Sequence, residues 1–440
     1  HLRGHVMKKK YQKWLGLAAV FALLLSAALS LTSSAFYYSG YVNSFLGITG
    51  ESIEVSGDTN YYPSAYGPLN AENADRLIAD ERDHNIRAMY EGTVLLRNEN
   101  SALPLAAGER SVTVFGNSVN DPIYKSNAGN ASFNADRGGE LYTALEAAGF
   151  QVNPTMRDAY ANSGIVRTSV ATRGGSTVGE APASFYTDTL KSSYASQYND
   201  VAIVLLTRYG GEGVDLDPLD ADGVPMLSLH QEEADLLRMI HDSGKFGKTV
   251  VLINSPFAMD IEWIEYEEYG VDACLVFGAA GDYGFIALMD ILTGAADVSG
   301  HLPDTWASSS LSAPAMQNFG DYKFTNLEKM YGDRYLVYAE GIYVTRYQDQ
   351  VLGINDANGP AGAFASDGGW DYAAEMAYPF GYGLSYAQFT QAVESILWDQ
   401  SAHTVTAAVK VTNNGGFDGK SKALVQLYAQ LPWEPGQAEK

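Results

Sequence analysis

A glutamate with glycines on both sides is the residue best suited to chemistry in this sequence. Glu212 lies in the segment Thr207–Asp215, directly after the apolar run 201–206. Glycines allow tight backbone turns and leave space for a ligand beside a carboxylate. A carboxylate just beyond a buried strand is held by a rigid scaffold, as an acid or base must be. From the local sequence alone, an exposed loop glutamate with no chemical task explains the pattern at least as well.

Other ligand-binding patterns are weaker. The glycines around Glu212 lack a phosphate-binding lysine and the Gly-x-Gly-x-x-Gly spacing, so nucleotide binding is not indicated. In the acidic stretch Asp215–Gly223, the first and last acidic positions of a helix–loop–helix calcium loop fall on Pro218 and Leu229. A looser calcium site stays open. We predict neither a catalytic metal nor a cofactor.

The composition is that of a folded, acidic protein. Its 440 residues, 46% of them hydrophobic, suffice for two or three domains with a buried core. Asp and Glu number 52 against 28 Lys and Arg, which gives a net charge of −24. Such a surface repels phosphate backbones, so nucleic acid is not an expected partner. The single cysteine, Cys274, excludes an internal disulfide, and its apolar neighbours predict a core position.

The N-terminal segment predicts export. Residues 1–6 precede Met7 and are left out of the fold prediction, and lysines then precede an uncharged apolar run from Trp14 to Leu31. Basic, apolar and then small residues form the order of an export signal. At 1.5 Å per residue the run also spans about 27 Å, enough to cross a bilayer. We expect residues 7–35 to be a cleaved signal peptide or a membrane anchor, with the rest extracellular, and 36–70 to be a linker.

Short apolar runs alternating with helical stretches predict the main domain. The helix expected from Ala71 has Asn70 as its cap, and a later one has a capping-box pattern at Ser228 and Gln231. Strands alternating with helices indicate a mainly parallel α/β sheet, whose sites gather where the strands end. The strands expected to be buried on both faces are 112–115, 201–206, 249–253 and 273–277.

The C-terminal residues have a different pattern. Residues 404–412 alternate as a strand, Asn413–Gly416 is a turn cluster, and 423–430 predicts another strand. This is typical of the opening of an antiparallel β domain. About seven strands are usual in such a sandwich, so we expect this domain to be truncated.

Several of these segments occur in the order found in the family 3 glycoside hydrolases, which are β-glucosidases and their relatives. Residues 378–386 are similar to the family's Pro-Phe-Gly-x-Gly-Leu-Ser-Tyr motif almost letter for letter. The glutamate loop resembles its Gly-Glu-Gly loop. The other segments that resemble family signatures are 91–98 with 103–105, 300–306, and 411–415.

The resemblance implies a fold and site residues. Residues 71–385 would form the family's six-stranded α/β sandwich domain, and 386–440 would begin a fibronectin type III-like domain. The role of general acid/base in a retaining mechanism transfers to Glu212, about 5–5.5 Å from a nucleophilic carboxylate. The family's glycine-rich loop after the first strand corresponds to residues 125–132, so Asn127, Asn130 and Ser132 are expected to contact sugar hydroxyls.

The sequence also departs from the family pattern. The family's nucleophile is an aspartate in a Ser-Asp-Trp motif of a (β/α)8 barrel, and a barrel needs about 250 residues that no segment here supplies. We expect the barrel downstream, as in members with permuted domain order, or in a partner chain. This chain alone would then be inactive. After Val344, Thr345-Arg346-Tyr347 replaces the family's usual continuation, which indicates a short deletion.

Two functions follow from the sequence. The first is the acid/base-carrying portion of an exported retaining β-glycosidase that hydrolyses O-glycosidic bonds of oligosaccharides. The alternative is a non-catalytic, surface-anchored carbohydrate-binding or interaction protein. An NAD or nucleotide enzyme on the same α/β pattern would need the phosphate motif that is missing here.

Overall fold

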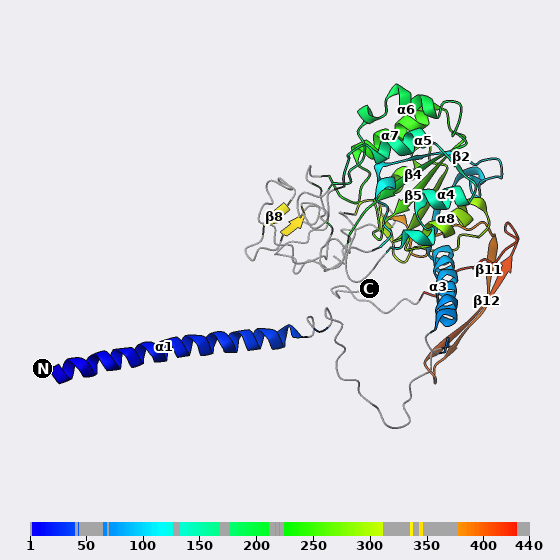
Figure 1. Ribbon diagram of the computed structural model, residues 1–440. Coiled ribbons are helices and arrows are strands. Elements are labelled where there is room, and N and C mark those ends of the chain that lie inside the picture. Colours follow the sequence, from blue (N-terminus) through cyan, green and yellow to red (C-terminus); the bar gives the residue numbers. More distant parts are fainter. Residues whose placement is uncertain are drawn as a thin grey trace. The chain divides into compact units, whose positions relative to one another are not determined.

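The computed structural model describes residues 2–39, 43, 65–67, 70–125, 133–167, 177–210, 216, 220, 224–310, 335–337, 343–345 and 376–428 (Figure 1). By its internal contacts the chain divides into two units, His1–Asn73 and Ala74–Lys440, which are described separately.

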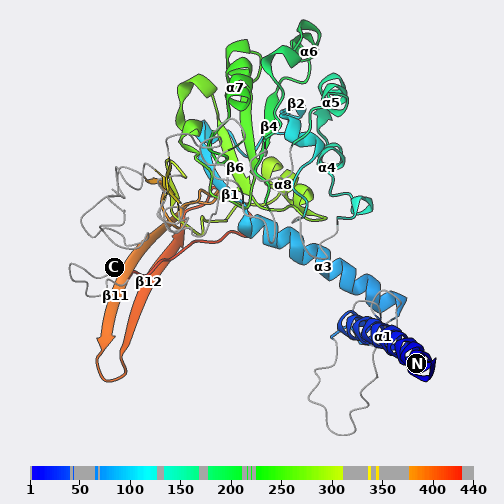
Figure 2. The same cartoon turned by 90° about the vertical axis from the view of Figure 1, so that its left-hand side faces the viewer.

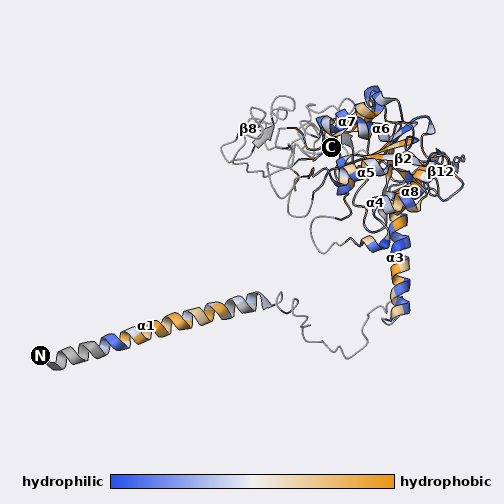
Figure 3. Ribbon diagram, turned by 45° about the horizontal axis from the view of Figure 1, so that its top comes forward, coloured by the Kyte–Doolittle hydropathy of each residue, from blue (hydrophilic) through white to orange (hydrophobic). Residues whose placement is uncertain are grey.

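The first unit contains one long apolar helix. Helix α1 spans Leu2–Tyr37, and its segment Tyr11–Thr32 has a mean hydropathy of 2.2 with none of it buried. Figure 3 shows hydrophobic residues along this part of the helix. The helix is long and apolar enough to cross a membrane, and equally to serve as a signal sequence. The apolar N-terminal helix expected from the sequence is therefore confirmed.

The second unit is built around a six-stranded sheet in the order β1-β6-β5-β4-β2-β3. The first strand is antiparallel to β6, and the other neighbours are parallel. Strands β4 and β6 are buried along their whole length because helices cover both faces, and Cys274 lies in this core as predicted. The strands are β1 (Val94–Asn98), β2 (Ser111–Phe115), β3 (Gln151–Val152), β4 (Val201–Thr207), β5 (Lys248–Asn254) and β6 (Ala273–Phe277).

Helices cover this sheet on both sides. Figure 1 shows α5, α6 and α7 on one side and α4 with α8 on the other. This architecture confirms the predicted fold class, a mainly parallel α/β domain. The helices are α3 (Ala71–Gly92), α4 (Leu141–Ala147), α5 (Pro154–Ala161), α6 (Asp188–Ser193), α7 (Gln231–Ser243) and α8 (Gly284–Thr293).

The helix starts agree with the sequence at α3 and differ at α7. Asn70 caps α3, because its Oδ1 accepts a hydrogen bond from the Asn73 N–H at 2.8 Å. The predicted capping box at Ser228 and Gln231 is wrong. Helix α7 begins two residues later, where the Glu233 carboxylate accepts from the His230 N–H at 2.9 Å. Ser228 instead donates its hydroxyl to the Pro225 carbonyl at 2.8 Å.

Three of the segments that resemble family signatures come together beside β1. The Gly300 N–H donates to the Thr93 carbonyl at 3.1 Å, and the Leu384 N–H donates to the Leu95 carbonyl at 2.9 Å. A Cβ added at Gly300 would lie 2.2 Å from the Thr93 oxygen, and one at Gly383 would lie 2.2 Å from the Gly300 oxygen. Glycine is required at both positions because three backbones stack directly on one another.

The Asp297 carboxylate holds this junction together. It is 3% exposed and accepts hydrogen bonds from the Tyr386 N–H at 2.8 Å, the Ser385 hydroxyl at 2.6 Å and the Ala387 N–H at 3.3 Å. The Ser421 hydroxyl donates to the same carboxylate. One side chain therefore joins the end of the α/β domain to the segment that follows β12.

Beyond this junction the described residues form small antiparallel sheets. Strands β11 (Phe389–Asp399) and β12 (Thr404–Asn413) pair as a long hairpin, visible at the edge of Figure 2. The predicted strand at 404–412 is thus confirmed. The strand predicted over 423–430 is wrong for its described residues, because 423–428 join no ladder. The shorter pairs are β7 (Trp306–Ala307) with β10 (Met376–Tyr378), and β8 (Tyr335–Val337) with β9 (Tyr343–Thr345).

Asp297→Ala should lower the free energy of unfolding by about 3 kcal/mol, because buried donors lose their acceptor. Urea denaturation measures this loss. Asp304→Asn removes the same charge from an exposed side chain seven residues away and should leave the midpoint nearly unchanged. Equal midpoints for the wild type and Asp297→Ala would show that Asp297 does not hold the junction.

Candidate functional site

The candidate site lies where the parallel strands of the sheet end. The segment from Arg208 to His230 connects β4 to α7, and the segment after Phe115 leaves the adjacent strand β2. Glu212, Asn127, Asn130 and Ser132 lie outside the described residues. The structure does describe the residues at the base of both loops, and these determine where each loop leaves the domain and returns to it.

Arg208 closes the base of the glutamate loop. Its side chain is fully buried, and all five of its N–H donors have acceptors. Nε donates to the Met226 carbonyl and Nη2 to the Ser228 carbonyl, both at 2.6 Å, while Nη1 donates to the Thr207 carbonyl at 2.9 Å. The two remaining donors bind the two oxygens of Glu233 at 2.7 Å each. One guanidinium thus ties together the end of strand β4, the last turn of the loop and helix α7.

Glu233 is the counter-ion that makes this burial possible. Its side chain is 2% exposed, and burial alone would raise the pKa of the carboxyl. The Arg208 guanidinium outweighs this effect and holds the pKa of Glu233 below its usual range. The pair therefore stays ionised at neutral pH, with bidentate geometry that fixes the orientation of both side chains.

A second polar contact orders the returning half of the loop. Asp220 Oδ2 lies 3.4 Å from His230 Nδ1, and Asp220 Oδ1 accepts from the Val224 N–H at 2.7 Å. The Asp220 N–H donates to the Val224 carbonyl at 2.8 Å, which closes a tight turn. Burial lowers the pKa of His230, so its imidazole is neutral at pH 7. The loop is thus folded back on itself before α7 begins.

Gly210, two residues after Arg208, lies against an aromatic ring. A Cβ added at Gly210 would lie 2.3 Å from the Phe257 ring. Phe257 follows β5, the next strand of the sheet, so Gly210 lies on the side of that neighbour. The glycine at position 210 therefore allows a close approach between loop and ring, in addition to backbone freedom.

The loop after β2 is closed by a ring pair. The rings of Tyr124 and Phe133 stack with centroids 3.9 Å apart and planes 17° apart, on either side of residues 126–132. The Asn254 side chain accepts from the Ile123 N–H at 2.6 Å, which ties this loop to the end of β5. Asp282 accepts from the Asn134 N–H at 2.8 Å on the other side. The segment that contains Asn127, Asn130 and Ser132 thus has both ends fixed.

A polar and aromatic cluster at the same edge was not predicted from the sequence. Arg167 donates to the Asp121 carboxylate at 2.7 Å and to the Thr207 hydroxyl, and it lies 5.0 Å from the centre of the Tyr209 ring. The Ser118 hydroxyl is 3.0 Å from that of Thr207. Only the position of Ser118 and Asp121 after a parallel strand could have indicated them. The cluster offers polar groups and a ring next to the base of the glutamate loop.

Glu180 is a second buried carboxyl at this edge. Its oxygens accept hydrogen bonds from the Asn117 N–H at 3.0 Å and the Ala181 N–H at 2.7 Å. Burial raises the pKa of Glu180 to about 8, and these hydrogen bonds only partly oppose the shift. Within the described ranges, no group of three or more His, Cys, Asp or Glu side chains is arranged to hold a metal ion.

Comparison with known proteins identifies the family to which most of the chain is similar. Residues 93–386 match the model of the glycosyl hydrolase family 3 C-terminal domain. The chain is 25% identical to beta-glucosidase A of Butyrivibrio fibrisolvens over 398 residues, which cover 82% of this chain and 43% of that protein. It is 29% identical to a beta-glucosidase of Ruminococcus albus over 347 residues, which cover 78% of this chain and 31% of the relative. The chain thus spans less than half of the length of either relative.

Solved structures share the fold. A beta-glucosidase from Paenibacillus barengoltzii matches with a TM-score of 0.54 at 23% identity, over 80% of this chain and 33% of that one. Beta-glucosidase 3B from Thermotoga neapolitana, in complex with glucose, matches with a TM-score of 0.53 at 24% identity, over 77% of this chain and 42% of that one.

Arg208→Met and Glu233→Met should each lower the free energy of unfolding by about 3–5 kcal/mol, because each leaves a buried charge without its partner. The double variant should cost clearly less than the sum of the two, and a urea-denaturation double-mutant cycle measures this coupling. Arg238→Met, on the same helix as Glu233, breaks ion pairs with Asp235 and Glu268 at the surface and contacts with Tyr269, and should change stability far less. Strictly additive losses would contradict a coupled pair.

Glu180→Gln should change how stability depends on pH. The folded-state pKa of Glu180 is about 8 against 4.5 for an ordinary glutamate, so the folded state keeps a proton that the unfolded state releases. The stability of the wild type relative to Glu180→Gln should therefore fall by several kcal/mol between about pH 4.5 and 8, and be level outside this window. Urea midpoints across this pH range measure the difference.

Glu109→Gln provides a comparison of opposite sign. Burial favours a higher pKa of Glu109, but the Lys248 ammonium and other partners hold it below 4.5. The stability contributed by Glu109 is thus present above pH 4.5 and is lost as the pH falls through the folded-state value. If the stability of the wild type relative to each of the two variants changed with pH in the same direction, the raised pKa of Glu180 would be ruled out.

Proposed function

The chain belongs to glycosyl hydrolase family 3, and from this membership we propose that it is the acid/base-carrying portion of an exported retaining β-glycosidase. Its substrates would be oligosaccharides or other β-glycosides, in which it hydrolyses an O-glycosidic bond. Relatives across its length are named beta-glucosidases, which supports this substrate class.

The observation that carries the proposal is the base of the Glu212 loop. Arg208 joins the end of β4 to the last turn of this loop through backbone carbonyls on both sides. A general acid must be held within hydrogen-bonding reach of the leaving oxygen, so a loop with a rigid base is the support that it needs.

The chemistry assigned to Glu212 has two steps. The protonated carboxyl first donates a proton to the leaving oxygen while a nucleophilic carboxylate forms a covalent glycosyl-enzyme. The resulting Glu212 carboxylate then removes a proton from water, which hydrolyses the intermediate. The nucleophile would come from a (β/α)8 barrel downstream or in a partner chain. Asn127, Asn130 and Ser132 would contact sugar hydroxyls from the loop closed by the Tyr124 and Phe133 rings.

The proposed domain organisation follows the same assignment. Residues 7–35 would be a signal peptide or membrane anchor, 36–70 a linker, 71–385 the α/β sandwich domain, and 386–440 part of a fibronectin type III-like domain. The apolar helix α1 supports export, and one relative over 46% of the chain is a periplasmic beta-glucosidase of Salmonella typhimurium. The protein would act outside the cytoplasm.

Glu212→Ala should lower turnover to different extents for substrates with good and with poor leaving groups. The variant is tested in the polypeptide encoded by the full reading frame. We expect a loss of about 100-fold or more in kcat for aryl glycosides with poor leaving groups, which need protonation, and a much smaller loss for good ones. Azide should restore turnover of the good substrates by attacking the glycosyl-enzyme without a general base.

Glu232→Gln supplies the matched control, because Glu232 is an exposed glutamate on α7 and should keep wild-type turnover. Equal, small losses for both leaving-group classes in Glu212→Ala would remove the acid/base assignment. Binding of oligosaccharide without turnover by the unmutated full polypeptide would favour a carbohydrate-binding protein instead.

A further inference from the structure

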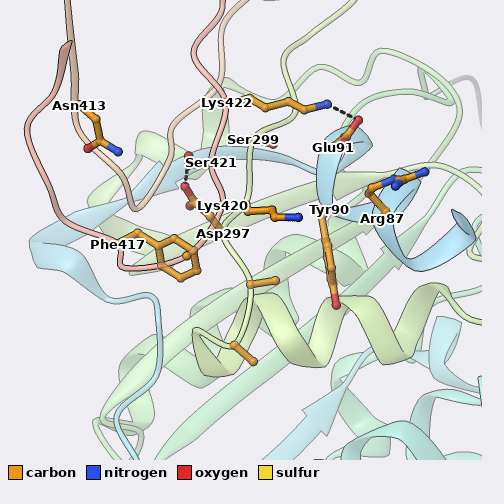
Figure 4. A pocket seen from close by; sticks show the side chains of 13 residues that line it. Arg87, Tyr90, Glu91, Asp297, Ser299, Asn413, Phe417, Lys420, Ser421 and Lys422 are labelled. Atoms are coloured by element: carbon orange, nitrogen blue, oxygen red, sulfur yellow. Dashed lines mark hydrogen bonds and ion pairs between the residues drawn. The ribbon is translucent and has the colours of Figure 1, made fainter. Parts of the chain in front are cut away.

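A pocket of about 660 Å³ lies between the end of α3, residues 295–299 and residues 413–422 (Figure 4). Its volume falls within the range of small-molecule sites. None of its lining residues belongs to the segment between β4 and α7 or to the loop after β2. The described lining therefore shares no residue with the described ends of the candidate catalytic loops.

The walls of this pocket are held by contacts within the protein. The Tyr90 hydroxyl donates to the Asp290 carboxylate at 2.6 Å, and the Ser299 N–H donates to the Tyr90 carbonyl at 3.2 Å. Opposite them, the Ser421 hydroxyl donates to Asp297. Because these contacts come from the fold itself, the pocket needs no ligand to keep its form.

The charges of the pocket do not balance. Of its two carboxylates, Glu91 pairs with Lys422 at 2.5 Å, and Asp297 already accepts the hydrogen bonds of the junction. Arg87 donates to the His84 ring, and Lys420 has no ion pair among the described residues. The pocket is thus lined by three cationic side chains and two carboxylates, an excess of one positive charge in a protein whose net charge is −24, and an anion would be attracted to this place.

The remaining lining groups suit a sugar ring better than a bare ion. Phe417, Ala295 and Ala296 provide apolar surface for C–H faces. Ser299 supplies a hydroxyl, and the Asn413 amide keeps its N–H donors because its oxygen already accepts from the Gly415 N–H at 2.8 Å. An inorganic anion would leave this apolar and hydroxyl-bearing wall without a partner.

We propose that this pocket binds a carboxylate-bearing sugar, such as a uronic acid unit of an oligosaccharide, with its carboxylate held by Lys420 and Arg87. The choice of a sugar rests also on the proposed function, whereas the choice of an anion rests on the pocket alone. The site would let the protein retain acidic glycans at a place separate from the bond to be cleaved.

Titration calorimetry of digalacturonic acid into the full 440-residue chain tests the proposal. We expect binding of one equivalent that weakens with rising salt, and no comparable heat with cellobiose, its neutral counterpart. Lys420→Gln should weaken binding about tenfold or more, and Lys420→Arg should retain most of it, since a charge-assisted hydrogen bond is lost only in the former. Lys420 is exposed, so neither substitution disturbs the core.

Lys410→Gln is the matched control, because Lys410 is an exposed lysine on β12 that does not line the pocket. A loss as large as that of Lys420→Gln would mean attraction by overall charge and would overturn the site. Tighter binding of inorganic phosphate than of digalacturonic acid would show that the pocket prefers an inorganic anion to a sugar. The absence of heat at millimolar digalacturonic acid would overturn the whole proposal. Since Glu212→Ala is scored by turnover and Lys420→Gln by binding, the failure of either proposal is seen separately.

Discussion

The Arg208 guanidinium holds together the two ends of the segment that contains Glu212. A buried guanidinium must find acceptors for five N–H groups, and here they come from three carbonyls and one carboxylate. The acceptors are the last residue of β4, the turn that precedes α7, and α7 itself. A hydrophobic side chain in its place would pack as well, but it would leave those carbonyls free to take other positions. The ion pair therefore fixes where the described ends of the loop lie relative to each other.

The ends of the two candidate loops are held by different kinds of interaction at the same edge of the sheet. The glutamate loop is closed by charge and hydrogen bonds at Arg208, and the loop after β2 by the stacked rings of Tyr124 and Phe133. Asn254 links the second loop to the end of β5, so both loops depend on adjacent parallel strands. In a retaining mechanism, acid and sugar contacts must keep their separation while a substrate enters. The Arg208 contacts and the Tyr124–Phe133 ring pair fix the ends of the two loops separately on one sheet, which is compatible with that requirement.

The sequence predicted the sheet well because its strands are buried on both faces. Such strands must be continuous apolar runs, and β4 and β6 are apolar for no other reason. The start of α7 was missed because it depends on a tertiary contact. Glu233 is committed to Arg208, 25 residues earlier in the chain, and local patterns cannot show that pairing. The same holds for β1, whose antiparallel pairing with β6 joins residues far apart in sequence. Glu212 was singled out by its glycines and by resemblance, whereas the arginine that closes its loop looked like an ordinary loop residue.

The motifs that identify the family most specifically turn out to be packing motifs. Gly300 and Gly383 are glycines because backbones stack there, and Ser385 and Tyr386 are bound to Asp297. The two glycines meet the backbone of a second segment and the other two residues meet one buried carboxylate, so a change at one position has to be matched at another. The resemblance is thus strongest where the fold allows least variation. The proposed activity would depend on a shorter loop, which would need one carboxyl on a fixed base. For this reason the Arg208 pair argues more directly for the proposed chemistry than the longer and more distinctive motifs do.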